Sequence, residues 1–169
     1  MRPRTLIFAF AIEDYQETAF RSVIYAEQDA QAFVAAWREM GVNPVDAVLL
    51  LGDQATRSEL RSSLRKTMSM AGPDDRVVLF FVGHGAALRG ATSVFAAFDT
   101  RAEDVEKSGI PLAEILNEIR QTQSRQVLLF MDVCHGAIQS ISGTQPCSPV
   151  LEGDFAVDEL RAFCKESLS

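Results

Sequence analysis

Two stretches of the sequence decide the fold: residues 76–85, RVVLFFVGHG, and residues 126–136, QVLLFMDVCHG. Each begins with an uninterrupted apolar run, which is typical of a strand buried on both faces of a parallel sheet. Each run leads into reactive side chains, His84 in the first stretch and Cys134 in the second. In parallel sheets, ligand-binding and active sites lie beyond the carboxyl ends of the strands. We therefore expect His84 and Cys134 at one edge of the same sheet.

Strand and helix signals alternate along the rest of the chain. Residues 6–12 and 47–51 are further buried-strand runs, and residues 93–98 are a short extra strand or hairpin arm. Apolar residues recur at helical spacing between residues 26 and 40. Further helices are expected from the capping box of Thr56 and Glu59 up to Gly72, and from Pro111 onward. This alternation predicts an α/β fold: a mostly parallel sheet flanked by helices on both faces.

The composition narrows the classes of protein to which this chain could belong. The chain has 169 residues, 47% of them hydrophobic, which is enough for one domain with its own core. The net charge of −7 and the scattered basic residues exclude a nucleic-acid partner. The first apolar run ends directly at Glu13 and Asp14, so it is a strand and not a signal peptide, and no run could span a membrane. Three cysteines at irregular spacing favour a reducing compartment, and we expect a cytoplasmic protein.

Cys134 is the candidate nucleophile. A free cysteine is usually an inert buried hydrophobe, but Cys134 follows a core strand at the edge where side chains surface. Cys147 and Cys164 have no such setting. A nucleophilic thiol needs a base, and imidazole is its usual partner. His84, between two glycines at the end of the other strand, is therefore the candidate acid/base.

Two further groups belong to this predicted site. The backbone amides of Gly85 and Cys134 are candidate donors for an oxyanion. His135 is expected to be structural, or to help shape the pocket, rather than to act as the base, since adjacent residues at a strand end point in different directions.

Two carboxylates remain open to interpretation. Asp132 could orient the histidine, receive a substrate cation, or end the strand in water. Asp29 lies at the start of the first expected helix, where alone it would complement the helix dipole. If both line one cleft, they favour a Lys or Arg side chain in the substrate.

At these residues the sequence resembles the caspase-like clan of cysteine peptidases, and within it the metacaspases and bacterial orthocaspases. The matching segments are VVLFFVGHG and VLLFMDVCHGA, with Cys134 placed 50 residues after His84. A separation of about 50 residues is the known caspase spacing. EQDA at 27–30, LLGDQATRSEL at 50–60 and VFAAFDT at 94–100 resemble further segments of the family in the same order.

The resemblance implies a His84–Cys134 dyad that cleaves polypeptides after Arg or Lys, with Asp29 and Asp132 as the acidic floor of the pocket. It implies no required cofactor and no catalytic metal, with Ca²⁺ as a candidate activator and self-cleavage as a candidate maturation step. The acidic residues Glu103, Asp104 and Glu106 are a weak calcium candidate and are expected to be a solvated loop.

The resemblance also predicts the chain's organisation. Residues 1–136 correspond to a caspase-like large-subunit region, and residues 137–169 to a loop and C-terminal tail that could serve as an intersubunit linker. The 35 residues after Cys134 do not resemble the family's small-subunit strands, which are expected to be missing. The alternatives are a processed large subunit, a truncated piece, or a half-domain that needs a small-subunit chain or C-terminal segment. A non-catalytic caspase-like interaction module is the competing function, and Val82, where metacaspases usually have Ser, is one departure from the family pattern.

Overall fold

The computed structural model describes residues 3–88, 92–135, 159, 162 and 163. The strands are β1 Thr5–Ala11, β2 Ala47–Leu51, β3 Arg76–Leu88, β4 Thr92–Phe95, β5 Ile110–Pro111 and β6 Gln126–His135. The helices are α1 Ala26–Glu39, α2 Arg57–Met70, α3 Val105–Ser108 and α4 Leu112–Gln121, with short 3-10 turns at Pro44–Asp46, Gly52–Gln54 and Ala102–Asp104. The strands and helices expected within these ranges are confirmed, including the Thr56 cap, whose side chain accepts a hydrogen bond from the Glu59 N–H at 3.3 Å.

The sheet is mixed, with a parallel centre. Strands β2, β1, β3 and β6 lie side by side and parallel, while β4 pairs antiparallel with β3, and β5 antiparallel with β4. Gly85 on β3 pairs with both β6 and β4, so β4 occupies the edge of β3 that β1 leaves free after Ala11. In the described residues no strand pairs with the outer edge of β6.

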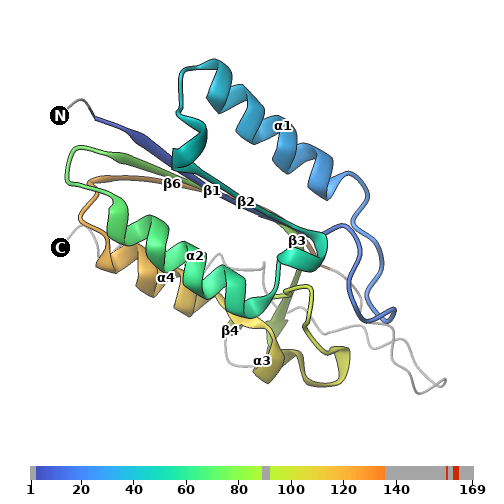
Figure 1. The fold of residues 1–169 in the computed structure, drawn as a ribbon. Coiled ribbons are helices and arrows are strands. Elements are labelled where there is room, and N and C mark those ends of the chain that lie inside the picture. Colours follow the sequence, from blue (N-terminus) through green and yellow to red (C-terminus); the bar gives the residue numbers. More distant parts are fainter. Residues whose placement is uncertain (1–2, 89–91, 136–158, 160–161, 164–169) are drawn as a thin grey trace.

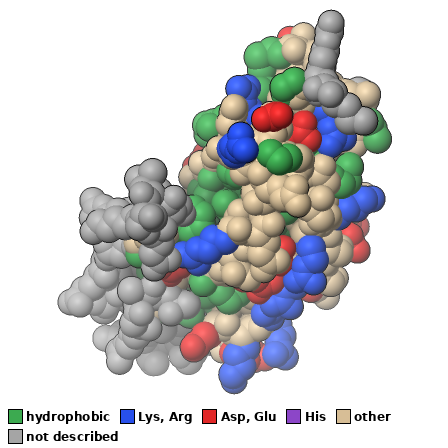
Figure 2. All heavy atoms as spheres, turned by 90° about the vertical axis from the view of Figure 1, so that its left-hand side faces the viewer, with side chains coloured by type: hydrophobic (Ala, Val, Ile, Leu, Met, Phe, Trp, Pro, Cys, Tyr) green, Lys and Arg blue, Asp and Glu red, His purple; other side chains and the backbone are tan. Residues whose placement is uncertain are grey.

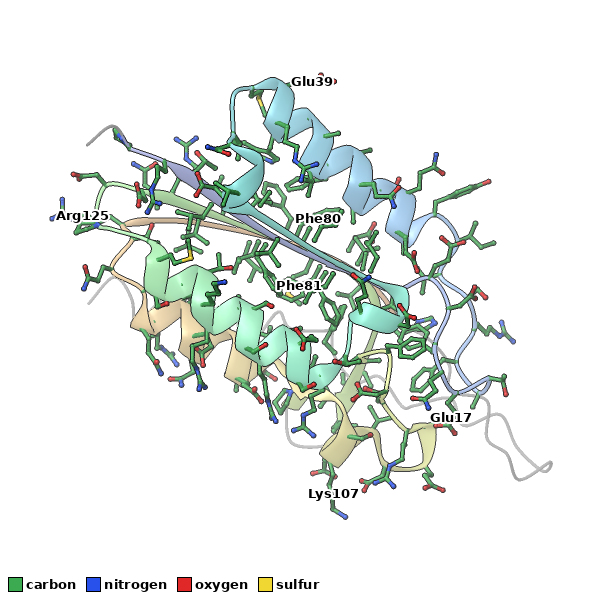
Figure 3. The ribbon with its side chains drawn as sticks, viewed as in Figure 1. Glu17, Glu39, Phe80, Phe81, Lys107 and Arg125 are labelled. Atoms are coloured by element: carbon green, nitrogen blue, oxygen red, sulfur yellow. The ribbon has the colours of Figure 1, made fainter. Side chains whose placement is uncertain are left out.

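Helices cover both faces of the sheet, as the sequence predicts: α1 lies on one face, and α2 and α4 lie on the other (Figure 1). Figure 3 shows Phe80 and Phe81, successive residues of β3, pointing to these opposite faces. Phe81 joins the large core beneath α2 and α4, whose biggest buried side chains include Phe8, Phe10 and Phe95. Phe80 packs on the α1 side, where it stacks against a phenylalanine of that helix.

Helix α1 runs antiparallel to the parallel strands. Its first turns, with Ala26 and Ala30, pack on Ala11, the last residue of β1, and on its β3 partner Val82. Val34, farther along the helix, packs on Ile7 near the amino end of β1. The beginning of α1 therefore lies at the carboxyl edge of the sheet, where the candidate site is expected.

The outer part of the α1 face is less well covered. On β6, Leu128 and Phe130 are 41% and 43% exposed, although both are large and apolar.

The end of the molecule where the chain begins carries basic, acidic and apolar side chains interspersed (Figure 2). No continuous basic area is seen on that face, and no helix of the described residues is long and apolar enough to cross a membrane.

Candidate active site

Strand pairing brings the two predicted catalytic residues together. In the parallel ladder between β3 and β6, His84 is the partner of Cys134, and Gly85 is the partner of His135. Neighbouring strands lie about 4.8 Å apart, so two residues 50 positions apart in the chain become neighbours. The side chains of Cys134 and His135 lie outside what the structure describes, and the predicted structural role of His135 stays a prediction.

Both reactive segments lie within strands, although the sequence placed them after the strand ends. Strand β3 continues through Gly83, His84 and Gly85 to Leu88, and β6 continues to His135. Glycine is a poor strand former, but here β6 on one edge and β4 on the other pair with this segment. The pairing holds His84 on a rigid element rather than in a loop.

The imidazole of His84 is buried, with 7% of the residue exposed, and its two nitrogens differ. Nε2 lies 2.6 Å from the backbone carbonyl oxygen of Arg21. Because a carbonyl oxygen can only accept, Nε2 must carry the proton in this bond. In the tautomer that this bond selects, Nδ1 carries the lone pair, and it is buried with no hydrogen-bond partner among the described residues. Nδ1 is then the nitrogen that can accept a proton from a thiol.

The loop between β1 and α1 surrounds His84, which sequence reasoning missed. The hydroxyl of Tyr15 accepts a hydrogen bond from the backbone N–H of His84 at 2.7 Å. The rings of Tyr15 and Phe20 both stack near the imidazole, with centroids 5.3 and 6.2 Å away. A weak signal was available, since this loop leaves the carboxyl end of β1 at the edge where such sheets hold their sites.

The predicted oxyanion donors lie next to each other in the ladder. Cys134 is opposite His84, and Gly85 is one step farther along β3. Their backbones are thus adjacent, and their role as donors stays a prediction.

The two predicted acidic residues are both exposed, and Asp132 lies on the α1 face of the sheet because its β3 partner Val82 packs on that helix. Phe33 of α1 and Phe130 of β6 meet with ring centroids 5.6 Å apart. Asp29 lies one helical turn before Phe33, a step of about 6 Å. Asp132 lies two strand residues after Phe130, a step of about 6.6 Å. Both steps lead toward the carboxyl edge, so the two carboxylates lie near the same end of the contact between α1 and β6.

Val82, the departure from the family pattern, is the β3 partner of Asp132. It is buried against Ala26 and Ala30 of α1. The wall beside Asp132 is therefore apolar at this position.

The acidic segment at 103–106 is held by ion pairs. Asp104 lies 3.9 Å from the Arg101 guanidinium and 3.7 Å from the Lys107 ammonium. In the part of the chain that the structure describes, no three potential ligands gather as a metal site would require. Cys147, Cys164 and most of the predicted loop and tail over 137–169 lie outside the described residues.

Comparison with known proteins identifies the family to which the chain is similar. The model of the caspase domain family, Peptidase_C14, matches residues 5–161. Among solved structures, the crystal structure of protein GSU0716 from Geobacter sulfurreducens is similar, with a TM-score of 0.66 and 20% identity, a likeness that shows the fold alone. The match covers 79% of this chain and 51% of that one, so the chain spans about half the length of that protein. No curated protein matches the chain.

Proposed function

From the premise that this chain belongs to the caspase-domain family of cysteine peptidases, we propose that it is a cysteine endopeptidase whose catalytic dyad is His84 and Cys134. The direct pairing of these two residues in the ladder carries the proposal, and the buried Nδ1 of the imidazole, which has no hydrogen-bond partner among the described residues, supports it. The fixed proton on Nε2 leaves Nδ1 as the nitrogen able to receive the thiol proton.

The proposed reaction has two steps. Nδ1 of His84 takes the proton of the Cys134 thiol, the sulfur attacks the scissile carbonyl carbon, and the C–N bond breaks as the proton passes to the leaving amine. Water then attacks the thioester, giving its proton to His84, and the C–S bond breaks to release the acid and restore the thiol. The amides of Gly85 and Cys134 are the proposed donors to the oxyanion in both steps.

We propose cleavage after Arg or Lys, as in metacaspases and bacterial orthocaspases. The support is the common placement of Asp29 and Asp132 at the carboxyl edge, on the elements whose Phe33 and Phe130 are in contact. Two carboxylates favour a cationic side chain and disfavour an acidic one. An active thiol also needs to stay reduced, which favours the cytoplasm as its compartment.

The substrate groove is proposed to need a second component. The exposed apolar face of β6 supports this, because Leu128 and Phe130 follow the outer strand at alternate positions. A small-subunit chain or C-terminal segment that adds a strand to this edge would pair with β6 and flank both side chains. The same face supports the second candidate function, a non-catalytic caspase-like module that binds its partner here.

A cleavage assay separates the two functions. The wild type is incubated with fluorogenic Arg, Lys and Asp peptides, with and without Ca²⁺ and with and without an added small-subunit segment. We expect cleavage of Arg and Lys peptides only, abolished by Cys134→Ala and by His84→Ala. If no combination cleaves an Arg or Lys peptide, the peptidase proposal is rejected and the interaction module remains.

A further inference from the structure

One short segment, the loop over residues 12–25 that joins β1 to α1, contacts His84 beside the strands that pair with it. Three groups of this loop contact it: the Tyr15 hydroxyl, the Phe20 ring and the Arg21 carbonyl. Tyr15 contributes most, since it bonds the backbone of His84 and also stacks on its ring. Tyr15 is 8% exposed.

Tyr15 restrains the plane of the imidazole. The two rings lie 26° apart in orientation with centroids separated by 5.3 Å. Phe20 stacks on Tyr15 at 4.9 Å with 30° between their planes and lies 26° from the imidazole plane, so the three rings form one tilted stack. A ring whose plane is set by stacking, and whose Nε2 is tied to Arg21, can direct Nδ1 only one way.

The strand beside His84 is built to admit Tyr15. At Gly83 a Cβ atom would lie 2.8 Å from the Tyr15 hydroxyl oxygen and 3.1 Å from the Phe95 ring. Real Cβ atoms essentially never come as close to another heavy atom as this one would to the hydroxyl, so any larger residue would displace the tyrosine. The glycine thus serves the tyrosine contact.

The loop itself is anchored on both sides. The N–H of Gln16 donates to the Phe98 carbonyl at 3.1 Å, and the N–H of Val23 donates to the Glu13 carbonyl at 2.8 Å. The Glu17 carboxylate accepts the N–H of Ala102 at 2.6 Å. The loop that carries Tyr15 is therefore anchored by bonds to residues other than those of β3, the strand that Tyr15 supports.

We propose that Tyr15 is a positioning residue for His84, which fixes the imidazole plane and strand position so that Nδ1 faces the nucleophile. This inference rests on the proposed function, in which Nδ1 is the base. Tyr15 itself takes no part in bond making.

Three variants test the inference by kinetics. Tyr15→Phe keeps the stacking but removes the hydroxyl, and we expect kcat to fall about 5- to 10-fold with little change in KM. Tyr15→Leu removes both contacts, and we expect a fall of about 30- to 100-fold. Tyr25→Phe is the matched control, because Tyr25 is 63% exposed, and its kcat should equal that of the wild type. Equal kcat in the wild type and Tyr15→Leu would overturn the inference.

Two further readouts do not need peptidase turnover. The ¹⁵N shifts of the imidazole should report a single Nε2–H tautomer in the wild type and in Tyr25→Phe, and a mixture in Tyr15→Leu. The rate of Cys134 alkylation by iodoacetamide should fall in Tyr15→Leu but not in Tyr25→Phe. If no peptide is cleaved but both changes appear, the proposed function fails and the positioning role stands. An unchanged tautomer and an unchanged alkylation rate in a folded Tyr15→Leu would overturn the positioning role, whatever the wild type cleaves.

Discussion

Asp75 provides the sharpest test of how the amino end of the sheet is held. Its carboxylate accepts the backbone N–H of Arg4 at 2.8 Å, the backbone N–H of Gly72 at 3.0 Å and the Arg4 guanidinium at 3.0 Å. These hydrogen bonds, the backbone bond from Arg4 foremost, lower the pKa of Asp75 from 3.8 to about 2. The carboxylate thereby joins the start of β1 to the segment between α2 and β3.

The sign and size of the effect follow from that pKa. A carboxylate with a depressed pKa adds stability above its unfolded value, near pH 4, and loses it as the pH falls toward 2. The full shift corresponds to about 2.5 kcal/mol at 1.36 kcal/mol per unit. Because the Arg4 side chain is 44% exposed, solvent weakens its share, and we expect about 1–2 kcal/mol.

Urea unfolding of the wild type, Asp75→Asn and Asp74→Asn across pH 7 to 2.5 measures this contribution. Asp75→Asn should be less stable by about 1–2 kcal/mol at pH 7, and its difference from the wild type should shrink toward pH 2.5. Asp74 is exposed, so Asp74→Asn serves as the neighbouring control and should follow the wild type. A stability difference between Asp75→Asn and the wild type that stays constant with pH would refute the reasoning.

Three further predictions concern packing, specificity and the open strand. Gly109→Ala would drive a Cβ into the side chain of Val94, and thermal melting should show a loss of about 1–3 kcal/mol, whereas retention of the wild-type Tm would contradict this packing. Asp132→Asn and Asp29→Asn should each reduce kcat/KM for Arg peptides about tenfold without creating Asp cleavage, and unchanged values would remove them from the pocket. Phe130→Gln should fold with a circular dichroism spectrum like that of the wild type but lose stimulation by an added small-subunit segment, and full stimulation would place the partner elsewhere.

Much of the fold could be predicted from the sequence because its signals are local. The apolar run at 47–51 and the Thr56 cap specify elements by themselves, and β2 and α2 form there. The extension of β3 through Gly83 and Gly85 could not be predicted, since it depends on pairing with β6 and β4, which are distant in the chain. Tertiary pairing here overrides the weak strand propensity of glycine.

The site residues, too, divide into those that the sequence predicted and those that it could not. The position of His84 and Cys134 after two buried apolar runs predicted their meeting at one edge of the sheet, and the parallel register shows that their backbones are neighbours. Tyr15 and the Arg21 carbonyl were missed, because neither residue type signals a role and only the return of the loop brings them to the imidazole. Asp29 alone fits a helix dipole, and its placement relative to Asp132 depends on how α1 crosses the sheet.

The central claim, that His84 activates Cys134, is tested most directly by peptide mapping after brief iodoacetamide treatment at mildly acidic pH. Cys147 and Cys164 serve as internal references within the same molecule. The account predicts that Cys134 is alkylated much faster than the other two, and that His84→Ala removes this difference. Equal reactivity of all three cysteines in the folded wild type would contradict it.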